Sequence, residues 1–372
     1  MQRVAVELYQ ALQRHTNVAL DAIILRSSWR MHHVVGIPWL LRTCRQIQRK
    51  AERGEIDAVL FSSMVSGTLV VLLQRTLAPL GIPMAIIAHG RDVTQPGPYQ
   101  RLVRRMFAAC DAVFPVSRAT GAACLERGLP NDKLRVIPNG INPDRFAPLH
   151  SFEARRRVLL ETLGSPDYRL PDDALLLCSV GRQVERKGFA WFIDNVMPLL
   201  PDDVHYWLAG NGPEAPAIAD AIRRHGLEQR VRLLGRVSEE NLAALYRGAD
   251  LFLMPNIPVP GDIEGFGVVM LEAGLSGLPT IASRLEGIQD VITEGINGHL
   301  VESGNAWAFS EAIMTYYHHR AALEAASRQA TRHTTQTFQW ATVADQYAQA
   351  MRALLPHIPT DESPVSVEKI LL

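Results

Sequence analysis

Long apolar runs, paired cysteines and a secretion signal are missing from this sequence. No run of about eighteen apolar residues, the length that crosses a bilayer, occurs. The most apolar stretch, residues 69–88, is interrupted by two prolines and by Gln74 and Arg75. The first ten residues carry charges in a helical pattern and lack the apolar core of a signal peptide. The sequence therefore predicts neither a membrane span nor secretion.

Metal-binding and dinucleotide-binding patterns are missing as well. The four cysteines are scattered, with no CxxC pair, so we expect reduced thiols in the cytoplasm and neither a metal cage nor a disulfide framework. No predicted strand is followed by G-x-G-x-x-G with an acidic residue about twenty positions later, which argues against a nicotinamide-dependent oxidoreductase. We predict no metal and no cofactor.

The sequence does contain enough apolar material for two domains. Its 372 residues are 47% hydrophobic and 20% charged, as in ordinary globular proteins, and one core rarely grows this large. Short runs of Val, Ile, Leu and Ala alternate with helical patterns, which is typical of parallel strands buried on both faces. This repetition predicts an α/β protein with two doubly wound, Rossmann-like domains. The expected strands are residues 18–25, 57–61, 83–88, 111–116 and 133–137, then 174–180, 204–209, 231–234, 250–254 and 279–282.

The boundary between the two series of strands lies between residues 146 and 173, where prolines and charges replace strand patterns. The three arginines at 155–157 fit the solvated face of a helix better than a phosphate site. We therefore expect an N-terminal domain (1–148), a linker (149–172), a C-terminal domain (173–337), a last helix (338–355) and a flexible tail (356–372).

The chain begins where a Rossmann-like domain would already be in its first helix. Val4, Leu8 and Leu12 share one face of a predicted helix, and no strand or glycine-rich turn precedes them. Loss of a central strand would leave its neighbours with unpaired edges. We therefore expect that the first strand is missing because the start of the chain is placed too far downstream.

The densest cluster of candidate site residues is EGFGVVMLE, from Glu264 to Glu272. It follows a predicted strand and opens a helix, and its two glycines let backbone N–H groups approach a ligand. The helix N-terminus favours an anion such as a diphosphate, whereas the two carboxylates suit sugar hydroxyls. The alternative, a plain amphipathic helix with a capping acid, leaves the glycines unexplained.

A second cluster, SVGRQVERKG at residues 179–188, lies where a predicted strand ends and a helix begins. Ligands usually bind at this place in open α/β sheets. Arg182 and Lys187 can both reach a diphosphate there, and their charges would stabilise a leaving group as it becomes negative. An ordinary surface turn is the competing interpretation.

Two further patterns are less specific. The segment LAGNGP places Gly210 and Gly212 after a strand, where they allow close backbone approach, but a GxG pattern alone is weak. His89 follows the predicted strand at 83–88, and we expect it to orient a sugar or a phosphate.

Together these motifs resemble the GT-B glycosyltransferases, specifically the retaining family 4 type. SVGRQVERKG, LAGNGPE, VRLLGRVS and EGFGVVMLE occur in the family's order and spacing, and the resemblance runs from Met1 to about Leu355. It implies two facing Rossmann-like domains, of which the first binds the acceptor and the second the donor. It also implies a last helix that crosses back to the first domain. The family's glycine-rich loop after the first strand has no counterpart here.

The resemblance implies a role for each candidate residue. Glu264 would bind hydroxyls of the donor sugar, Glu272 the ribose hydroxyls, and Arg182 and Lys187 the diphosphate. His89 matches a cleft histidine near the sugar, and Val237 falls where the family contacts the base through its backbone. The other positions implied to line the nucleotide sugar are Gly181, Gly210, Asn211, Gly265, Phe266, Gly267 and Val268.

The implied reaction is retaining transfer of a hexosyl group from a nucleotide-diphosphate sugar to an acceptor hydroxyl, in cell-surface glycan, lipopolysaccharide or exopolysaccharide synthesis. UDP- and GDP-linked donors both remain open, as do same-face attack and double displacement. No DxD motif occurs, so cationic side chains and a helix N-terminus are expected to replace a metal. The alternative is a non-catalytic, glycosyltransferase-like binding or partner subunit.

The charge of the chain is uneven, which bears on its partners. Residues 1–150 contain 19 basic and 10 acidic residues, a charge of about +9, and residues 151–372 carry about −9. Residues 38–53 combine Trp39 and Leu40 with several arginines, so this helix could lie on an anionic bilayer or could be an ordinary surface helix. The membrane interpretation predicts a cytoplasmic protein that is peripheral on the inner face and has a lipid-linked acceptor. We expect no nucleic-acid partner, because no recognition motif accompanies the charge.

Overall fold

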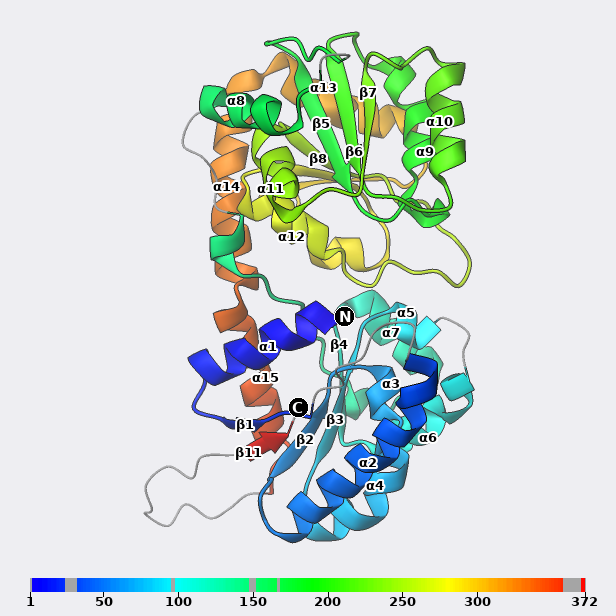
Figure 1. Cartoon of the computed structure of the whole chain (residues 1–372), viewed down its shortest axis with the longest axis vertical. Helices are drawn as coiled ribbons and strands as arrows, with labels where there is room; N and C mark the ends of the chain where they lie inside the picture. Colours follow the sequence, from blue (N-terminus) through cyan, green and yellow to red (C-terminus); the bar gives the residue numbers. More distant parts are fainter. Residues whose placement is uncertain are drawn as a thin grey trace. The chain divides into compact units, whose positions relative to one another are not determined.

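The computed structural model describes residues 2–23, 32–94, 98–146, 152–165, 168–356 and 369–371. The chain forms two compact units, each built on its own parallel sheet (Figure 1). Unit 1 comprises residues 1–140 and 340–372, and unit 2 comprises residues 141–339. The predicted α/β class with two Rossmann-like domains is confirmed.

Unit 1 contains a five-stranded sheet of order β1-β11-β2-β3-β4, with every pair parallel. Strands β2 to β4 are entirely buried, as short runs of apolar residues between helices must be. The strands are β1 (Ala19–Asp21), β2 (Ala58–Phe61), β3 (Met84–Ala88), β4 (Ala112–Pro115) and β11 (Lys369–Leu371).

Helices cover both faces of this sheet (Figure 1). Helix α1 packs against α15 on one side, and α2, α4 and α6 pack together on the other. Trp340, which opens α15, donates its indole N–H to Glu7 of α1 at 2.9 Å. The helices are α1 (Gln2–His15), α2 (His32–Glu52), α3 (Met64–Gly67), α4 (Val70–Leu77), α5 (Arg91–Thr94), α6 (Val103–Ala109), α7 (Arg118–Glu126) and α15 (Trp340–Arg352).

Two expectations for unit 1 are corrected, the flexible tail at 356–372 and the strand at 133–137. Strand β11 lies between β1 and β2 and pairs with both of them, and Ile370 is only 2% exposed there. Residues 369–371 are therefore part of the sheet and not of a flexible tail, since a strand at this place satisfies the edges of both neighbours. The expected strand at 133–137 is reduced to backbone bonds beside β4, from Arg135 to Val113 and from Ile137 to Pro115.

Unit 2 contains a six-stranded parallel sheet of order β10-β9-β8-β5-β6-β7. Helices α9, α10 and α13 bury their apolar faces against one side of it, and Phe192 and Phe309 lie in this core. The strands are β5 (Leu175–Val180), β6 (Val204–Ala209), β7 (Val231–Gly235), β8 (Leu251–Met254), β9 (Thr280–Ser283) and β10 (Gly298–Val301). The helices are α8 (Phe152–Leu163), α9 (Phe189–Asn195), α10 (Ala215–Arg224), α11 (Glu239–Gly248), α12 (Val268–Leu275), α13 (Ala306–His318) and α14 (Arg320–Phe338).

The strand order of unit 2 reverses at β5. The chain runs outward through β6 and β7, returns to β8 on the other side of β5, and continues to β9 and β10. The loops that leave the carboxyl ends of β5 and β8 therefore lie at the switch point, which is the usual place for a ligand in open α/β sheets. Residues 181–188 and 255–267 form these two loops, so the fold brings two of the predicted clusters to one edge.

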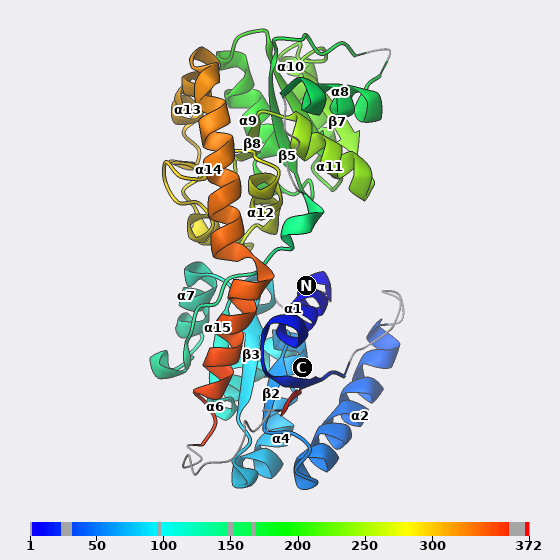
Figure 2. The ribbon, with the colours of Figure 1, turned by 90° about the vertical axis from the view of Figure 1, so that its left-hand side faces the viewer.

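The expected linker belongs largely to unit 2. Helix α8 packs on α11, and Arg156 is buried and pairs with Asp250 at 3.0 Å. The prediction that the arginines at 155–157 form only a solvated face is therefore wrong for Arg156, whose charge is compensated inside the unit. Phe146 also packs against Tyr246 of unit 2. At the far end, the chain leaves unit 2 after Gln339 and enters unit 1 with α15 (Figure 2).

Within the described part of the chain, no helix combines the length and the apolar character needed to cross a membrane.

Candidate nucleotide-sugar site

The two loops at the switch point of unit 2 are bonded to each other. The backbone N–H of Ile257 donates to the carbonyl of Arg186 at 3.0 Å. Gly188 adopts a positive φ of 64°, and a Cβ there would lie 2.0 Å from the carbonyl oxygen of Pro255. Only glycine therefore allows the first loop to close against the second, which brings the cations at 186–187 to the acidic residue at 264.

Glu264 lies at the centre of a buried cluster of charges. Its Oε2 pairs with Lys187 Nζ at 2.6 Å and with the Arg186 guanidinium, and it accepts a hydrogen bond from the Asn256 amide at 3.2 Å. All four residues are at most 8% exposed. Three donors on one oxygen hold the carboxylate in a single orientation. Among the residues that the structure describes, none donates to the other oxygen, Oε1.

The cluster keeps Glu264 ionised. Burial alone would raise the pKa of this carboxyl, but the charges of Lys187 and Arg186 outweigh burial and lower the pKa to about 2. Burial also lowers the pKa of Lys187, and the charge of Glu264 partly opposes that effect. The arrangement therefore offers a fixed, negatively charged Oε1 as an acceptor for a hydroxyl group.

Helix α12 begins directly beyond this cluster. Gly267 caps it with a positive φ of 83°, so the segment Gly265–Val268 turns from the loop into the helix. Gly265 and Phe266 are buried, whereas Gly267 and Val268 are half-buried. The predicted placement of these four residues at a helix N-terminus is therefore present, and the N-terminal amide groups of an eight-residue helix favour an anion.

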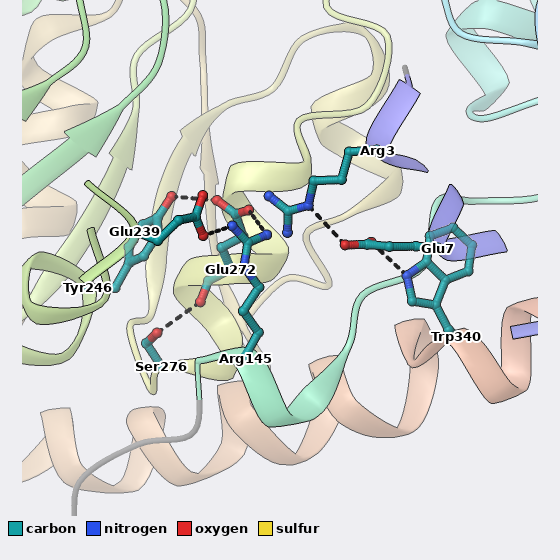
Figure 3. Close-up of polar contacts among 8 residues, drawn as sticks. All are labelled: Arg3, Glu7, Arg145, Glu239, Tyr246, Glu272, Ser276 and Trp340. Carbon is teal, nitrogen blue, oxygen red and sulfur yellow. Dashed lines mark hydrogen bonds and ion pairs between the residues drawn. The ribbon is translucent and has the colours of Figure 1, made fainter. Parts of the chain in front are cut away.

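Glu272 lies one turn into the same helix and forms a second acidic site (Figure 3). It is 5% exposed. Its Oε2 accepts the hydroxyl of Tyr246 at 3.0 Å, and its Oε1 lies 3.5 Å from Arg145, which also pairs with Glu239. The helix packs so closely on α14 that a Cβ at Gly274 would lie 2.3 Å from the hydroxyl oxygen of Thr334. Glu264 and Glu272 thus have separate partners.

Arg182 and Lys187 do not form one pair of cations. Lys187 is buried against Glu264, whereas Arg182 is exposed just after β5. The Arg182 side chain makes no hydrogen bond or ion pair with any residue in the described ranges, so it can meet an anion from solvent. The two residues come from one loop but have different surroundings, which the sequence pattern did not distinguish.

The two glycines after β6, Gly210 and Gly212, serve the packing of the loops. A Cβ at Gly210, whose φ is 132°, would lie 1.8 Å from the carbonyl oxygen of Gly181. The N–H of Gln183 donates to the carbonyl of Asn211 at 3.0 Å, which joins the two loops. Close approach of backbone to backbone explains these glycines without a ligand. Asn211 is exposed, and Val237 is half-buried in the turn between β7 and α11.

His89 belongs to unit 1, at the carboxyl end of β3. Its Nε2 lies 3.0 Å from the carbonyl oxygen of Ser62, which can only accept a hydrogen bond and so assigns the ring hydrogen to Nε2. Burial lowers the pKa of His89, so the ring is neutral at pH 7 and Nδ1 is an acceptor. Asp92 accepts the backbone N–H groups of His89 and Met64 at 2.8 and 3.2 Å and holds this turn.

The sequence motifs missed several residues that complete the site. The motif gave roles to Arg182 and Lys187 but none to Arg186, whose burial depends on the close contact of the two loops at Gly188. Three others have no motif of their own: one precedes Glu264 in the same loop, and two reach Glu272 from other elements. These residues are Asn256, Tyr246 and Arg145.

No group of three or more histidine, cysteine, aspartate or glutamate side chains is placed to hold a metal ion in the part of the chain that the structure describes. The four cysteines are buried and unpaired by disulfides.

Comparison with known proteins covers both units. Residues 2–145 match the model of Glycosyltransferase Family 4, and residues 174–319 match that of Glycosyl transferases group 1. The chain is 27% identical to an amylovoran biosynthesis glycosyltransferase of Erwinia amylovora over 246 residues, which are 64% of this chain and 56% of the relative. It is 30% identical to a D-inositol 3-phosphate glycosyltransferase of Xylanimonas cellulosilytica over 69% of this chain and 62% of the relative. The matches therefore span little more than half the length of these curated relatives.

Solved structures extend the likeness of fold to nearly the whole chain. HepE of Anabaena in complex with UDP has a TM-score of 0.74 and 18% identity, with 95% of this chain and 96% of that chain covered. Sucrose-phosphate synthase of Thermosynechococcus elongatus has a TM-score of 0.69 and 21% identity, with 95% and 93% covered. With the two family matches and the two parallel sheets, the chain is a member of the group 1, family 4 glycosyltransferases and has their GT-B fold.

Proposed function

We propose that this protein is a retaining glycosyltransferase that moves a hexosyl group from a nucleotide-diphosphate sugar to an acceptor hydroxyl. The observation that carries the proposal is the geometry at Glu264. Lys187 and Arg186 keep this carboxylate ionised, and its Oε1 accepts no hydrogen bond from the described residues. The carboxylate lies at the same edge of the sheet as the N-terminus of α12. A fixed carboxylate beside an anion-binding helix end fits a sugar joined to a diphosphate.

Each part of the site then has one task. Oε1 of Glu264 accepts hydroxyls of the donor sugar, and Glu272 accepts ribose hydroxyls after Tyr246 has oriented it. Arg182 and the N–H groups at the start of α12 bind the diphosphate. They stabilise the charge that grows on it as the bond from the anomeric carbon breaks, so the reaction needs no metal. A solved structure of similar fold supports such a donor, since HepE of Anabaena was determined in complex with UDP-glucose.

We propose same-face substitution for the chemical step. The acceptor oxygen forms a bond to the anomeric carbon as the bond to the phosphate oxygen breaks, and the acceptor proton passes to that phosphate oxygen. Glu264 is already held by two cations, so its carboxylate is a poor nucleophile and acts by positioning the sugar. His89 is neutral, and its Nδ1 would accept a hydrogen bond from a hydroxyl of the sugar.

The acceptor belongs to a surface glycan in this proposal. Two similar proteins support this part: the amylovoran biosynthesis glycosyltransferase of Erwinia amylovora and a putative colanic acid biosynthesis glycosyltransferase of Escherichia coli. In unit 1, the exposed side of α2 carries Leu41, which is 52% exposed, beside Arg42 and Arg45. A helix with this surface binds an anionic bilayer, which would place the protein at the inner face of the membrane next to a lipid-linked acceptor.

A transfer assay tests the proposal. The protein is incubated with UDP- and GDP-linked hexoses, with and without chelator, and with lipid-linked glycans in anionic vesicles, and products are identified by mass and anomeric configuration. We expect one donor class to give a retained linkage that chelator does not reduce. Glu264→Gln should lower the rate at least 100-fold, while Glu228→Gln, at an exposed carboxylate of the same unit, leaves it unchanged. An inverted product, or full activity in Glu264→Gln, would contradict the assignment.

A further inference from the structure

One residue beside Glu264 has a backbone conformation that costs free energy. Among the residues described, Glu286 alone combines a side chain with a positive φ, here 46°. The left-handed region is unfavourable for residues with a Cβ and is normally occupied by glycine. Residues that retain such a conformation tend to lie at functional sites, where the surroundings enforce it.

The position of Glu286 in the loop after β9 accounts for the conformation. Its Oε2 accepts the backbone N–H of Glu264 at 2.5 Å. The next residue, Gly287, donates its own N–H to the carbonyl of Glu264 at 3.1 Å. Gly287 must be glycine, because a Cβ there would lie 2.2 Å from the carbonyl oxygen of Gly265. Two consecutive residues thus hold both backbone polar groups of Glu264.

The surroundings of Glu286 make this contact expensive for a carboxylate. Burial raises the pKa of Glu286, the bond from the Glu264 N–H opposes that effect, and the charge of Glu264 raises the pKa further. A neutral acceptor or a water molecule could satisfy the Glu264 N–H with less electrostatic repulsion. The loop therefore keeps this contact at an electrostatic cost that the charge of Arg186 only partly offsets.

We propose that Glu286 is a positioning residue that fixes the main chain of Glu264, so that Oε1 points to the donor sugar. The side-chain contacts of Lys187, Arg186 and Asn256 fix only Oε2, at the far end of a flexible chain of bonds. The contact from Glu286 fixes the other end, the backbone from which the side chain starts. Both ends must be held for Oε1 to have one position. The inference rests on the proposed function, because it assigns the sugar to Glu264.

Three substitutions separate the carboxylate from the backbone strain. Glu286→Gln keeps an oxygen that can accept the N–H. Glu286→Gly removes the carboxylate and the strain, and Glu286→Ala removes the carboxylate but keeps the strain. We expect the Gly and Ala variants to lose transfer activity equally, by at least tenfold, although the Gly variant has the higher unfolding midpoint. The Gln variant should stay within about threefold of the wild type, and Glu311→Gln, at an exposed carboxylate of α13, serves as the control.

A purely structural role predicts a different pattern. Transfer activity would then follow the unfolding midpoint, so the Ala variant would be less active than the Gly variant. The affinities for free nucleotide and for nucleotide sugar would fall together. The positioning role predicts that the affinity for the free nucleotide stays unchanged in all three variants, while the affinity for the nucleotide sugar falls in Gly and Ala. Either the structural pattern or full activity in the Gly variant would overturn the proposal.

Hydrogen exchange tests the contact independently of catalysis. In the wild type and in Glu286→Gln, the amide of Glu264 should be protected within the peptide 262–268, and in the Gly and Ala variants it should exchange at least tenfold faster. Unchanged protection in Gly and Ala would overturn the positioning role even if transfer is found. Loss of protection in those variants, with no transfer by the wild type, would reject the proposed function and leave the contact itself established.

Discussion

Replacing Glu264 by Gln tests whether the buried charge cluster has the energetics that its geometry implies. The pKa of this carboxyl lies at about 2, against an ordinary value of 4.5. A difference of about 2.5 units corresponds to about 3 kcal/mol of folding stability from the ionised carboxylate at pH 7. Glutamine removes that charge and leaves the buried Lys187 without its carboxylate, whereas Arg186 keeps its pair with Asp262 at 3.2 Å. Removing one partner of a buried ion pair by itself costs about 3–5 kcal/mol. Both estimates place the loss at about 3 kcal/mol or more.

The expected loss can be measured by differential scanning calorimetry, in which the two units can unfold separately. For a unit of about 200 residues, 3 kcal/mol corresponds to a fall of roughly 6–12 °C in the midpoint of the unit 2 transition. Glu228→Gln, which changes an exposed carboxylate of the same unit, should leave the midpoint unchanged.

The pH dependence of the difference has a definite sign. Because the pKa is lower in the folded than in the unfolded state, the stabilisation is complete above about pH 5 and is lost as the pH falls toward 2. The difference in the free energy of unfolding between the wild type and Glu264→Gln should therefore shrink by about 1 kcal/mol as the pH is lowered from 7 to 4. Equal stability of the two proteins at pH 7, or a gap that stays constant over this range, would refute the reasoning about the cluster.

Three other substitutions test the structure around the site and in unit 1. Gly188→Ala should lower the unfolding midpoint of unit 2 by at least 6 °C, because the new Cβ meets a carbonyl oxygen. Gly226 has a similar φ but open space around it, so Gly226→Ala should cost only about 1 kcal/mol of stability. Equal effects of the two substitutions would argue against the loop contact. Tyr246→Phe should weaken nucleotide binding about threefold to tenfold in calorimetric titration, because Glu272 loses the hydrogen bond from the tyrosine hydroxyl. Unchanged affinity would mean that Glu272 does not bind the nucleotide. Ile370→Ala should destabilise unit 1 by about 2–4 kcal/mol in the same calorimetry, whereas an unchanged unit 1 transition would mean that β11 does not pair in solution.

Local patterns in the sequence were sufficient to predict the class of fold and most of the strands. Short apolar runs bounded by glycine or proline identify buried parallel strands wherever the run itself carries the signal, as it does in β5 and β8. The segment at 133–137 also contains Leu, Val and Ile, but two of its five residues are charged, and it lies beside β4 without forming a strand. The pairing of β11 is invisible locally, since its partners lie more than 300 residues away.

The candidate site shows the same division. Glu264, Lys187 and Glu272 belong to compact motifs, so their spacing alone predicted that they share an edge of the sheet. The side chains that tune them come from other elements. Arg186 reaches Glu264 only because the loop closes at Gly188, and Glu286 reaches it from the loop after β9. Neither contact leaves a pattern in the sequence, because each depends on the three-dimensional path of two loops.

The most direct test of the central claim is the thermal unfolding of unit 2 with UDP-, GDP- and ADP-linked sugars. A ligand that binds only the folded state raises the midpoint by mass action. The account predicts that one nucleotide class raises the unit 2 midpoint, that Glu272→Gln reduces the shift for nucleotide and nucleotide sugar alike, and that Glu264→Gln reduces only the part contributed by the sugar. If no nucleotide sugar raises the midpoint at millimolar concentration, or if both variants respond like the wild type, Glu264 and Glu272 do not form a donor site.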